Sequence, residues 1–453
     1  MKKLFILSVG VMLGVGTVSA QSFHIKNKSV TYSFPASTTG EMTFSHNGSI
    51  LNVLGKDLAM EDGTQMWTDE SEIKENVVTI TYSGASANVD IAGNIAGYVE
   101  AVVNGAHVLI TQSPEVSENS CGEITYRLSG DSGDGSFYME GSYKSTIELS
   151  GLELTNPSGA AIDIQNGKRI AMSIKSGTMN ILTDGEAGSQ KGCIVCKGHL
   201  EFKGKGELTV AGRSSHAIYA KEYIEMKNCS INVVSAIKDG MNCNQYFLME
   251  SGRLTISGTG DDGIQVSYKD SADRETEDTG SVTIKDGEIN INVTSDAAKG
   301  IKCEGSMIVT DGTVNISVSG DGVWDSSKSK TKASASLASD EDMVINGGSL
   351  KLTATGGGGK GINCDGNLTI NGGNIEIITS GGIVAYLNNT LYTNYTGNTD
   401  RLASDIKSSP KGIKADGDVV INGGEIKVVT TGNGAEGIES KSVLTITDGD
   451  IYV

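Results

Sequence analysis

The sequence predicts an all-β protein whose main part is a parallel β-helix, with coils of about 22–25 residues and an N-terminal β-rich cap. Three observations predict this fold class. The phrase KGINCDGNLTINGGNIEI at 360–377 recurs in variants along the chain, apolar and polar residues alternate within its short runs, and the chain contains 60 Gly and only 4 Pro. A period of two is typical of strands with one buried face, and a repeated set of strands and turns is typical of a solenoid.

Each repeat unit contains three short strand-like runs, as in GINC, NLTI and NIEI, separated by turns. One coil cannot bury its own apolar face, so we expect coils to stack about 4.8 Å apart. The units are expected to open at Gly192, Ala217, Gly240, Gly263, Gly300, Gly322, Gly361, Gly412 and Gly437. One corner of each coil carries a Gly that we expect at positive φ, namely Gly177, Gly287, Gly312, Gly348, Gly373, Gly424 and Gly449.

The chain divides into three parts. Residues 1–20 have two Lys, an apolar stretch and Val18-Ser19-Ala20, which predicts a secretory signal peptide cleaved after Ala20. The protein is therefore expected to be secreted or held at the cell surface. Residues 21–75 lack the repeat and form the expected cap. Residues 76–453 form the expected β-helix, which stops partway through a coil and is therefore expected to be truncated at its C-terminal end.

The formal net charge of −19 restricts the possible partners. An acidic surface repels nucleic acid and anionic lipid, and no segment after the signal peptide is apolar enough to span a membrane. The same surface attracts cations. If the ligand is itself acidic, a divalent metal is the simplest group that could bridge protein and ligand.

Cysteines occupy one inward position of the predicted coils. Cys196, Cys243, Cys303 and Cys364 share it, and Ala220, Val266 and Ser339 occupy it in the coils between. The cysteines are then about 9.6 Å apart. A disulfide requires Cα atoms within about 7 Å, so we expect buried free thiols.

Three insertions interrupt the repeat, at residues 267–280, 326–337 and 383–410. The first two are expected to leave the coil at the same corner and to wall a groove. Solvated loops without a role are the alternative.

Carboxylates gather at the position that opens each unit. Asp239 and Asp262 are expected on adjacent coils, Asp261 precedes Asp262, and Asp321 is a further candidate. Hard oxygen ligands on rigid turns suit Ca²⁺. The sequence therefore predicts a calcium site, and the alternative is a solvated acidic column with Lys neighbours such as Lys299.

The next outward position suits a sugar ligand. Aromatic rings stack on sugars, and amides or ammonium groups bind hydroxyls and carboxylates. The residues expected there are Tyr219, Asn242, Gln265, Lys302 and Trp324. An ordinary solvated sheet face is the alternative.

Other catalytic or metal-binding motifs are not found in the sequence. The five His lack zinc spacing, and no nucleophile elbow or phosphate loop stands in a suitable context.

Several of these motifs resemble one family. KGIKADGDVVINGG, GDDGI at 260–264 and EGIESKSVLTITDGDIYV are similar to bacterial secreted carbohydrate-binding-domain proteins typified by a clostridial acid-sugar (pectin) binder. The resemblance covers residues 75–453. It implies a right-handed parallel β-helix, similar in fold to pectate lyases, that binds calcium and acidic polysaccharide without established catalysis. Through GDDGI it puts Asp261 and Asp262 forward as calcium ligands, whereas Asp239 and Asp321 depart from the doubled Asp.

Three functions remain open on the sequence. The first is a non-catalytic binder of pectin-like polymers in which Ca²⁺ bridges protein and uronate carboxylates. The second is a calcium-dependent polysaccharide lyase, in which Lys302 or Lys299 would abstract the proton α to the uronate carboxylate. The third is a repeat adhesin or stalk with no sugar site.

Overall fold

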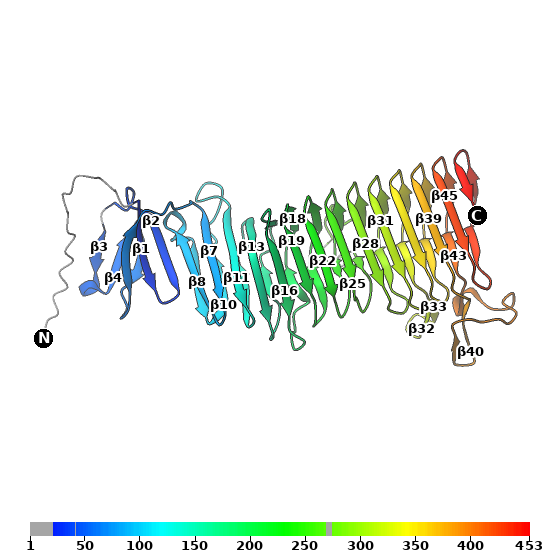
Figure 1. Ribbon diagram of the computed structural model, residues 1–453, viewed down its shortest axis with the longest axis horizontal. Helices are drawn as coiled ribbons and strands as arrows, with labels where there is room; N and C mark the ends of the chain where they lie inside the picture. The colour runs from blue at the N-terminus through cyan, green and yellow to red at the C-terminus, as the bar shows by residue number, and fades with distance from the viewer. Residues whose placement is uncertain (1–20, 41, 269–273) are drawn as a thin grey trace.

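The computed structural model describes residues 21–40, 42–268 and 274–453. The signal-peptide prediction for residues 1–20 lies outside the described residues. Figure 1 shows coils stacked along the long axis of the molecule, with the N-terminal strands at one end. Parallel pairing between successive coils confirms the predicted parallel β-helix.

Each full coil contributes one strand to each of three faces. Face 1 is a thirteen-stranded sheet. Its strands are β9 Val99–Asn104, β10 Ala106–Gln112, β12 Gly135–Glu140, β14 Ile162–Gln165, β17 Gly192–Cys196, β20 His216–Ala220, β23 Met241–Cys243, β26 Ile264–Val266, β29 Lys299–Cys303, β34 Ala335–Ser339, β37 Lys360–Cys364, β43 Lys411–Ala415 and β46 Glu436–Ser440.

Faces 2 and 3 follow face 1 in every coil. Face 2 contains β15 Ile170–Ile174, β18 Leu200–Gly204, β21 Ile224–Lys227, β24 Tyr246–Met249, β27 Ser281–Ile284, β30 Met307–Val309, β35 Met343–Ile345, β38 Leu368–Ile370, β44 Val419–Ile421 and β47 Leu444–Ile446. Face 3 contains β16 Met179–Asp184, β19 Glu207–Ala211, β22 Ser230–Ser235, β25 Arg253–Ser257, β28 Glu288–Val293, β31 Thr313–Val318, β36 Ser349–Ala354, β39 Asn374–Thr379, β45 Glu425–Thr430 and β48 Asp450–Tyr452.

The first coils join the cap to the stack. The strands β7 Val77–Ser83 and β11 Ile124–Ser132 pair in parallel, and β13 Ser145–Asn156 is long enough to pair with both β15 and β16. β8 Ser86–Ala92 pairs antiparallel with β7, and the 3₁₀-helix η2 Gly93–Ile95 follows it. The stack therefore begins near Val77.

The cap has its own small core of Ile25, Phe34, Leu51, Val53, Leu58 and Ala96. It contains β1 Ser22–Asn27, β2 Val30–Pro35, β3 Thr43–Ser45, η1 His46–Gly48, β4 Ile50–Val53, β5 Lys56–Ala59 and β6 Gln65–Asp69. β2 also pairs in parallel with β8, which attaches the cap to the stack.

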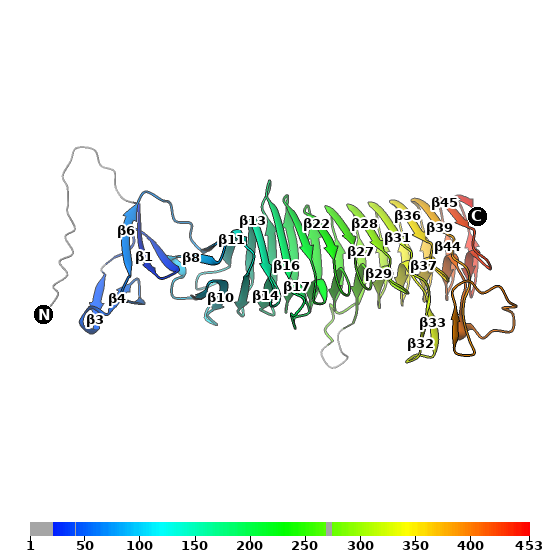
Figure 2. The ribbon, with the colours of Figure 1, turned by 60° about the horizontal axis from the view of Figure 1, so that its bottom comes forward.

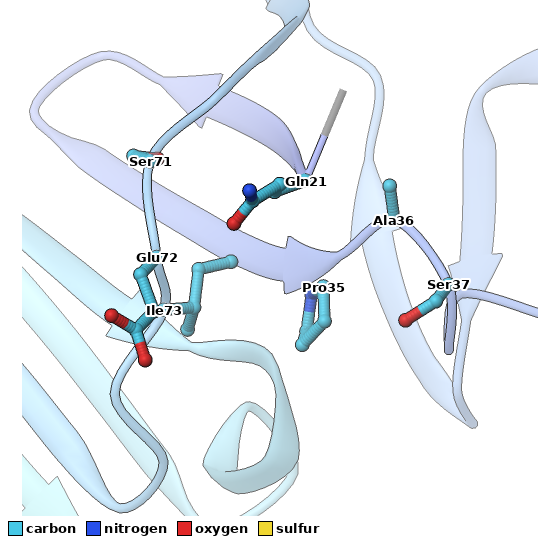
Figure 3. Close-up of a pocket in the computed structure, with 7 residues that line it drawn as sticks. All are labelled: Gln21, Pro35, Ala36, Ser37, Ser71, Glu72 and Ile73. Atoms are coloured by element: carbon cyan, nitrogen blue, oxygen red, sulfur yellow. The ribbon is translucent and has the colours of Figure 1, made fainter. Parts of the chain in front are cut away.

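A cavity of about 430 Å³ lies in this cap (Figure 3). Its lining residues are Gln21, Pro35, Ala36, Ser37, Ser71, Glu72 and Ile73. Glu72 is the one ionisable side chain among these seven residues, so the cavity offers little chemistry.

The interior follows the predicted columns. Cys196, Ala220 and Cys243 are successive partners in face 1, and Val266, Cys303, Ser339 and Cys364 continue the column. All seven cysteines are free thiols. The predicted corner glycines have positive φ; Gly348, for example, has φ +89°.

One coil was misassigned from the sequence. Lys299 pairs with Ala335, and Ala335 pairs with Lys360. The face 1 strand of this coil is therefore β34, and Gly322 does not open a unit. Residues 319–334 instead leave the stack as a hairpin of β32 Val323–Asp325 and β33 Lys330–Lys332. The stretch GDGVW misled the assignment because it begins with Gly-Asp, as GDDGI does.

The predicted groove wall was also wrong. The insertion at 267–280 leaves between β26 and β27, from face 1 toward face 2, whereas the β32–β33 hairpin leaves between face 3 and face 1. The third insertion leaves at this second corner too. It contains β40 Val384–Leu387, β41 Thr390–Tyr392, η3 Ser404–Ile406 and β42 Lys407–Ser408. The second and third insertions lie against each other and project from the same side of the stack (Figure 2).

Candidate metal and polysaccharide site

Three carboxylates meet at the corner between face 3 and face 1. Met241 and Ile264 are partners on adjacent coils, which places Asp239 and Asp262, two residues before them, next to each other. One oxygen atom from each of Asp239, Asp261 and Asp262 lies within 4.8 Å of the others. Such a spacing can hold one cation between the three side chains.

Two of these carboxylates also complete the backbone of the corner. Oδ1 of Asp239 accepts a hydrogen bond from the amide of Asp262 at 3.1 Å, and Oδ1 of Asp262 accepts one from the amide of Lys299 at 2.6 Å. Nδ2 of Asn242 donates to Oδ2 of Asp239 at 2.7 Å. Buried amides require an acceptor, so Asp239 and Asp262 have a structural role whether or not a metal binds.

Burial differs among the three. Asp239 and Asp262 are 5% and 6% exposed, whereas Asp261 is exposed to solvent. Burial raises the pKa of Asp262 to about 7; Lys299 acts against this shift, and Asp261 and Asp239 add to it. Partial desolvation and the charge of Asp239 raise the pKa of Asp261. The corner therefore favours neutralisation by a proton or a cation.

Asp321 does not join these three residues. Its amide donates to Oδ1 of Asp296 at 2.9 Å, and its own Oδ1 accepts from the amide of Gly357 at 2.7 Å. Asp321 therefore completes the backbone hydrogen bonding at the root of the β32–β33 hairpin, away from the three carboxylates. In the described part of the chain, Asp239, Asp261 and Asp262 form the one group of three or more His, Cys, Asp or Glu side chains spaced for a metal.

The predicted outward column is correct for four of its five residues. Tyr219, Asn242, Gln265 and Lys302 are successive partners on face 1. The next partner is Ala338, and Trp324 lies on the excursion hairpin instead. On the β32–β33 hairpin, the ring of Trp324 stacks on Tyr386, with centroids 4.2 Å apart and an interplanar angle of 7°.

Tyr219 is not an open platform for a sugar. Its side chain is 6% exposed, because Nζ of Lys191 lies 4.5 Å from the ring centroid and the ring of His216 stacks on it at 5.9 Å. Gln265 directs its amide to Oγ of Ser267 at 3.1 Å. Asn242, Gln265 and Lys302 are all half-buried, and among the described residues Lys302 is the one of the three whose side chain has no hydrogen bond or ion pair within the protein.

The lysines next to the carboxylates extend beyond those predicted. Lys299 and Lys302 lie one coil past Asp262, and Lys360 lies two coils past Lys299. Burial lowers the pKa of Lys299, and the Asp262 carboxylate acts against this shift. The sequence showed Lys360 as a repeat position. The sequence already placed it two units past Lys299, but with Asp321 between them, whereas the structure places Ala335 there.

One of three comparisons with known proteins identifies a family for this chain. A family model described as carbohydrate-binding domain-containing protein matches residues 104–383. A search of curated proteins found no match. A solved structure of a polysaccharide lyase-like protein from C. thermocellum, in a gadolinium derivative, is 21% identical and covers 65% of this chain and 96% of its own, with a TM-score of 0.42. Among the described residues no helix is long and apolar enough to cross a membrane. Because the family model spans more than half of the sequence, this chain belongs to the family of carbohydrate-binding domain-containing proteins.

Proposed function

We propose that the protein is a non-catalytic binder of acidic polysaccharide of the pectin or polygalacturonate class, in which Ca²⁺ bridges the protein to uronate carboxylates. Family membership supports a carbohydrate ligand. The observation that carries the calcium proposal is the convergence of Asp239, Asp261 and Asp262 at one corner.

The chemistry of Ca²⁺ suits such a corner. The ion takes six to eight oxygen ligands at about 2.3–2.6 Å, more than three carboxylates can supply when two of them also accept backbone amides. The remaining positions are then available to water and to ligand oxygens. Asp261 is exposed, so a polymer outside the stack could share the ion with it.

The charge of the chain supports the same arrangement. With a formal charge of −19, the protein as a whole repels a polyuronate, and a bound cation at the corner offsets that repulsion. We further propose that the mature chain acts outside the cell after cleavage at Ala20. Extracellular calcium modules bind with dissociation constants of about 10⁻⁴–10⁻³ M, so a site of modest affinity would suffice there.

A lyase is the second candidate, favoured by one observation. The lowered pKa of Lys299 makes an uncharged amine, and hence a general base, easier to form beside the carboxylate cluster. A lyase would leave an unsaturated sugar end that absorbs ultraviolet light. Incubation of the full chain with polygalacturonate and Ca²⁺ tests this, and a stable absorbance would exclude the lyase.

Retention on insoluble polygalacturonate, first with Ca²⁺ and then with a chelator, tests the main proposal. We expect retention that weakens on chelation. The variant Asp261→Asn should lose the calcium-dependent part, because it removes an exposed ligand that caps no amide. Asp321→Asn is the matched control at the same corner of the coil. Equal retention with and without calcium would overturn the bridging mechanism, and no retention in either condition would favour a stalk.

A further inference from the structure

An arrangement of lysines lies beyond the carboxylate corner on face 1. Lys299 and Lys360 are the two partners of Ala335, on the coils before and after it. Lys302 and Asn363 are likewise the two partners of Ala338. Neighbouring coils are about 4.8 Å apart, so long cationic side chains lie on both sides of a coil that has only alanine methyl groups at these two positions.

None of these three lysines forms an ion pair with a carboxylate in the described part of the chain. Within residues 21–40, 42–268 and 274–453, no carboxylate oxygen lies within 4.0 Å of Nζ of Lys299, Lys302 or Lys360. Nζ of Lys360 instead donates to the carbonyl of Gly358 at 3.1 Å and to Oγ of Ser408 at 2.8 Å. Nζ of Lys299 donates to the carbonyl of Ala297.

The next coil shows that pairing is possible on this face. Nζ of Lys411 lies 2.6 Å from Glu436 and 2.7 Å from Glu439, and Nζ of Lys414 lies 2.5 Å from Asp416. The chain has 55 acidic residues against 36 Lys and Arg. A shortage of carboxylates therefore does not explain three unpaired ammonium groups.

The electrostatics of the cluster also favour an anion. Burial lowers the pKa of Lys360 to about 7, and repulsion from Lys414, Lys299 and Lys411 adds to this shift. The charges of Asp261 and Asp340 interact with that of Lys302 from beyond ion-pair distance. A ligand carboxylate placed among the three amines would relieve this repulsion.

The β32–β33 hairpin and the third insertion lie beside these lysines. The β32–β33 hairpin leads directly into β34, the strand that carries Ala335 and Ala338, and its Lys332 lies close enough to act on the charge of Lys299. It presents Trp324, which stacks on Tyr386 of the other insertion. The hairpin that reaches Lys299 thus also carries an aromatic ring, an apolar surface on which a sugar ring can pack.

We propose that Lys299, Lys302 and Lys360 form a direct anion site, which takes a uronate carboxylate without metal, starting one coil beyond the carboxylate cluster. This inference rests on the proposed function, because it assumes that the polymer is acidic. The polymer would then be bound through a cation at the Asp corner and through ammonium groups at the lysine cluster.

Calorimetric titration of the full chain in EDTA with a galacturonate oligomer tests the proposal. The same oligomer with methyl-esterified carboxylates is the ligand control. We expect Lys302→Met and Lys360→Met each to weaken binding about tenfold or more, since each removes a charge-assisted hydrogen bond, and the ester to bind as weakly. Lys427→Met, which removes an exposed lysine on face 3, is the matched control and should bind as the wild type does.

A second measurement covers the case in which a variant fails to fold. In protein with isotopically labelled lysine, the galacturonate oligomer should raise the pKa of Lys360 toward its ordinary value, as seen by side-chain NMR. An unchanged Lys360 signal at saturating oligomer, or equal binding of the oligomer and its ester, would overturn the lysine site.

The two proposals fail separately. Binding in EDTA without any gain from Ca²⁺ would support the lysine site and contradict the calcium bridge. Binding only with Ca²⁺ would contradict the lysine site and support the bridge. No binding to acidic oligomers in either condition would overturn both.

Discussion

The amide of Asp262 donates a hydrogen bond of 3.1 Å to Oδ1 of Asp239, which lies one coil earlier. The same side chain that would carry negative charge to a metal therefore also satisfies the backbone of the next coil. An Asn at either position keeps an acceptor oxygen and removes the charge. Asp-to-Asn variants can thus separate the structural role of this corner from its electrostatic role.

Asp262→Asn should stabilise the protein in EDTA at pH 8. The folded-state pKa of Asp262, about 7, exceeds the 3.8 of an unperturbed aspartate, so the folded protein binds more protons than the unfolded chain between these values. Stability from this group is therefore lost as pH rises through that window. The melting temperature of the variant should exceed that of the wild type at pH 8 and by less at pH 5. An equal difference in melting temperature at pH 8 and pH 5 would contradict the raised pKa of Asp262.

Calcium affinity should rise as pH increases through about 7. Asp262 must lose its proton to become a ligand, so binding near pH 6.5 should release a fraction of a proton per site. Calorimetry in two buffers with different heats of ionisation measures that release. Identical heats in both buffers would contradict a role for Asp262 as a ligand.

The thiols of the interior column should resist both oxidation and modification. Burial raises the pKa of Cys196 and Cys243 to about 12, and successive cysteines are separated by a coil. We expect these thiols to react with a disulfide reagent only after unfolding, and reductant to leave the melting temperature unchanged. Mass spectrometry of the labelled native protein checks this, and rapid native labelling of Cys243 would contradict the buried column.

Gly348→Ala should destabilise the stack by about 1–2 kcal/mol, because an L side chain is disfavoured at φ +89°. Its Cβ would also lie 2.8 Å from the carbonyl oxygen of Gly312 on the preceding coil. Gly167→Ala is the control, since that glycine has no positive φ and open space around it. Chemical unfolding of both variants makes the comparison. Equal stability of the two would argue against the conformational requirement.

The sequence was sufficient for the register wherever a unit followed the previous one directly. The series Cys196, Ala220 and Cys243 identified the inward column, because side chains of period two repeat in each coil. The glycine corners were equally predictable, since positive φ restricts the residue type. Asp239, Asp261 and Asp262 were brought together by the same register.

Other parts of the site depended on neighbours that are distant in sequence. Tyr219 was expected to be exposed, but Lys191 from the preceding coil covers its ring. The lysine cluster was missed because Trp324 was placed where Ala338 stands, which concealed the gap between Lys302 and Asn363. Two Gly-Asp corners of similar sequence, one leading into a strand and one into a hairpin, cannot be told apart by pattern alone.

The backbone pairing of face 1 sets the spacing between the two proposed binding places. The distance between the Asp corner and the lysine cluster is fixed by whole coils, so it can change only in steps of about 4.8 Å, whatever side chains the coils carry. A polymer that binds at both places must therefore carry charged groups whose spacing matches a whole number of coils. Ligand choice would depend on the repeat length of its charged units as well as on their chemistry.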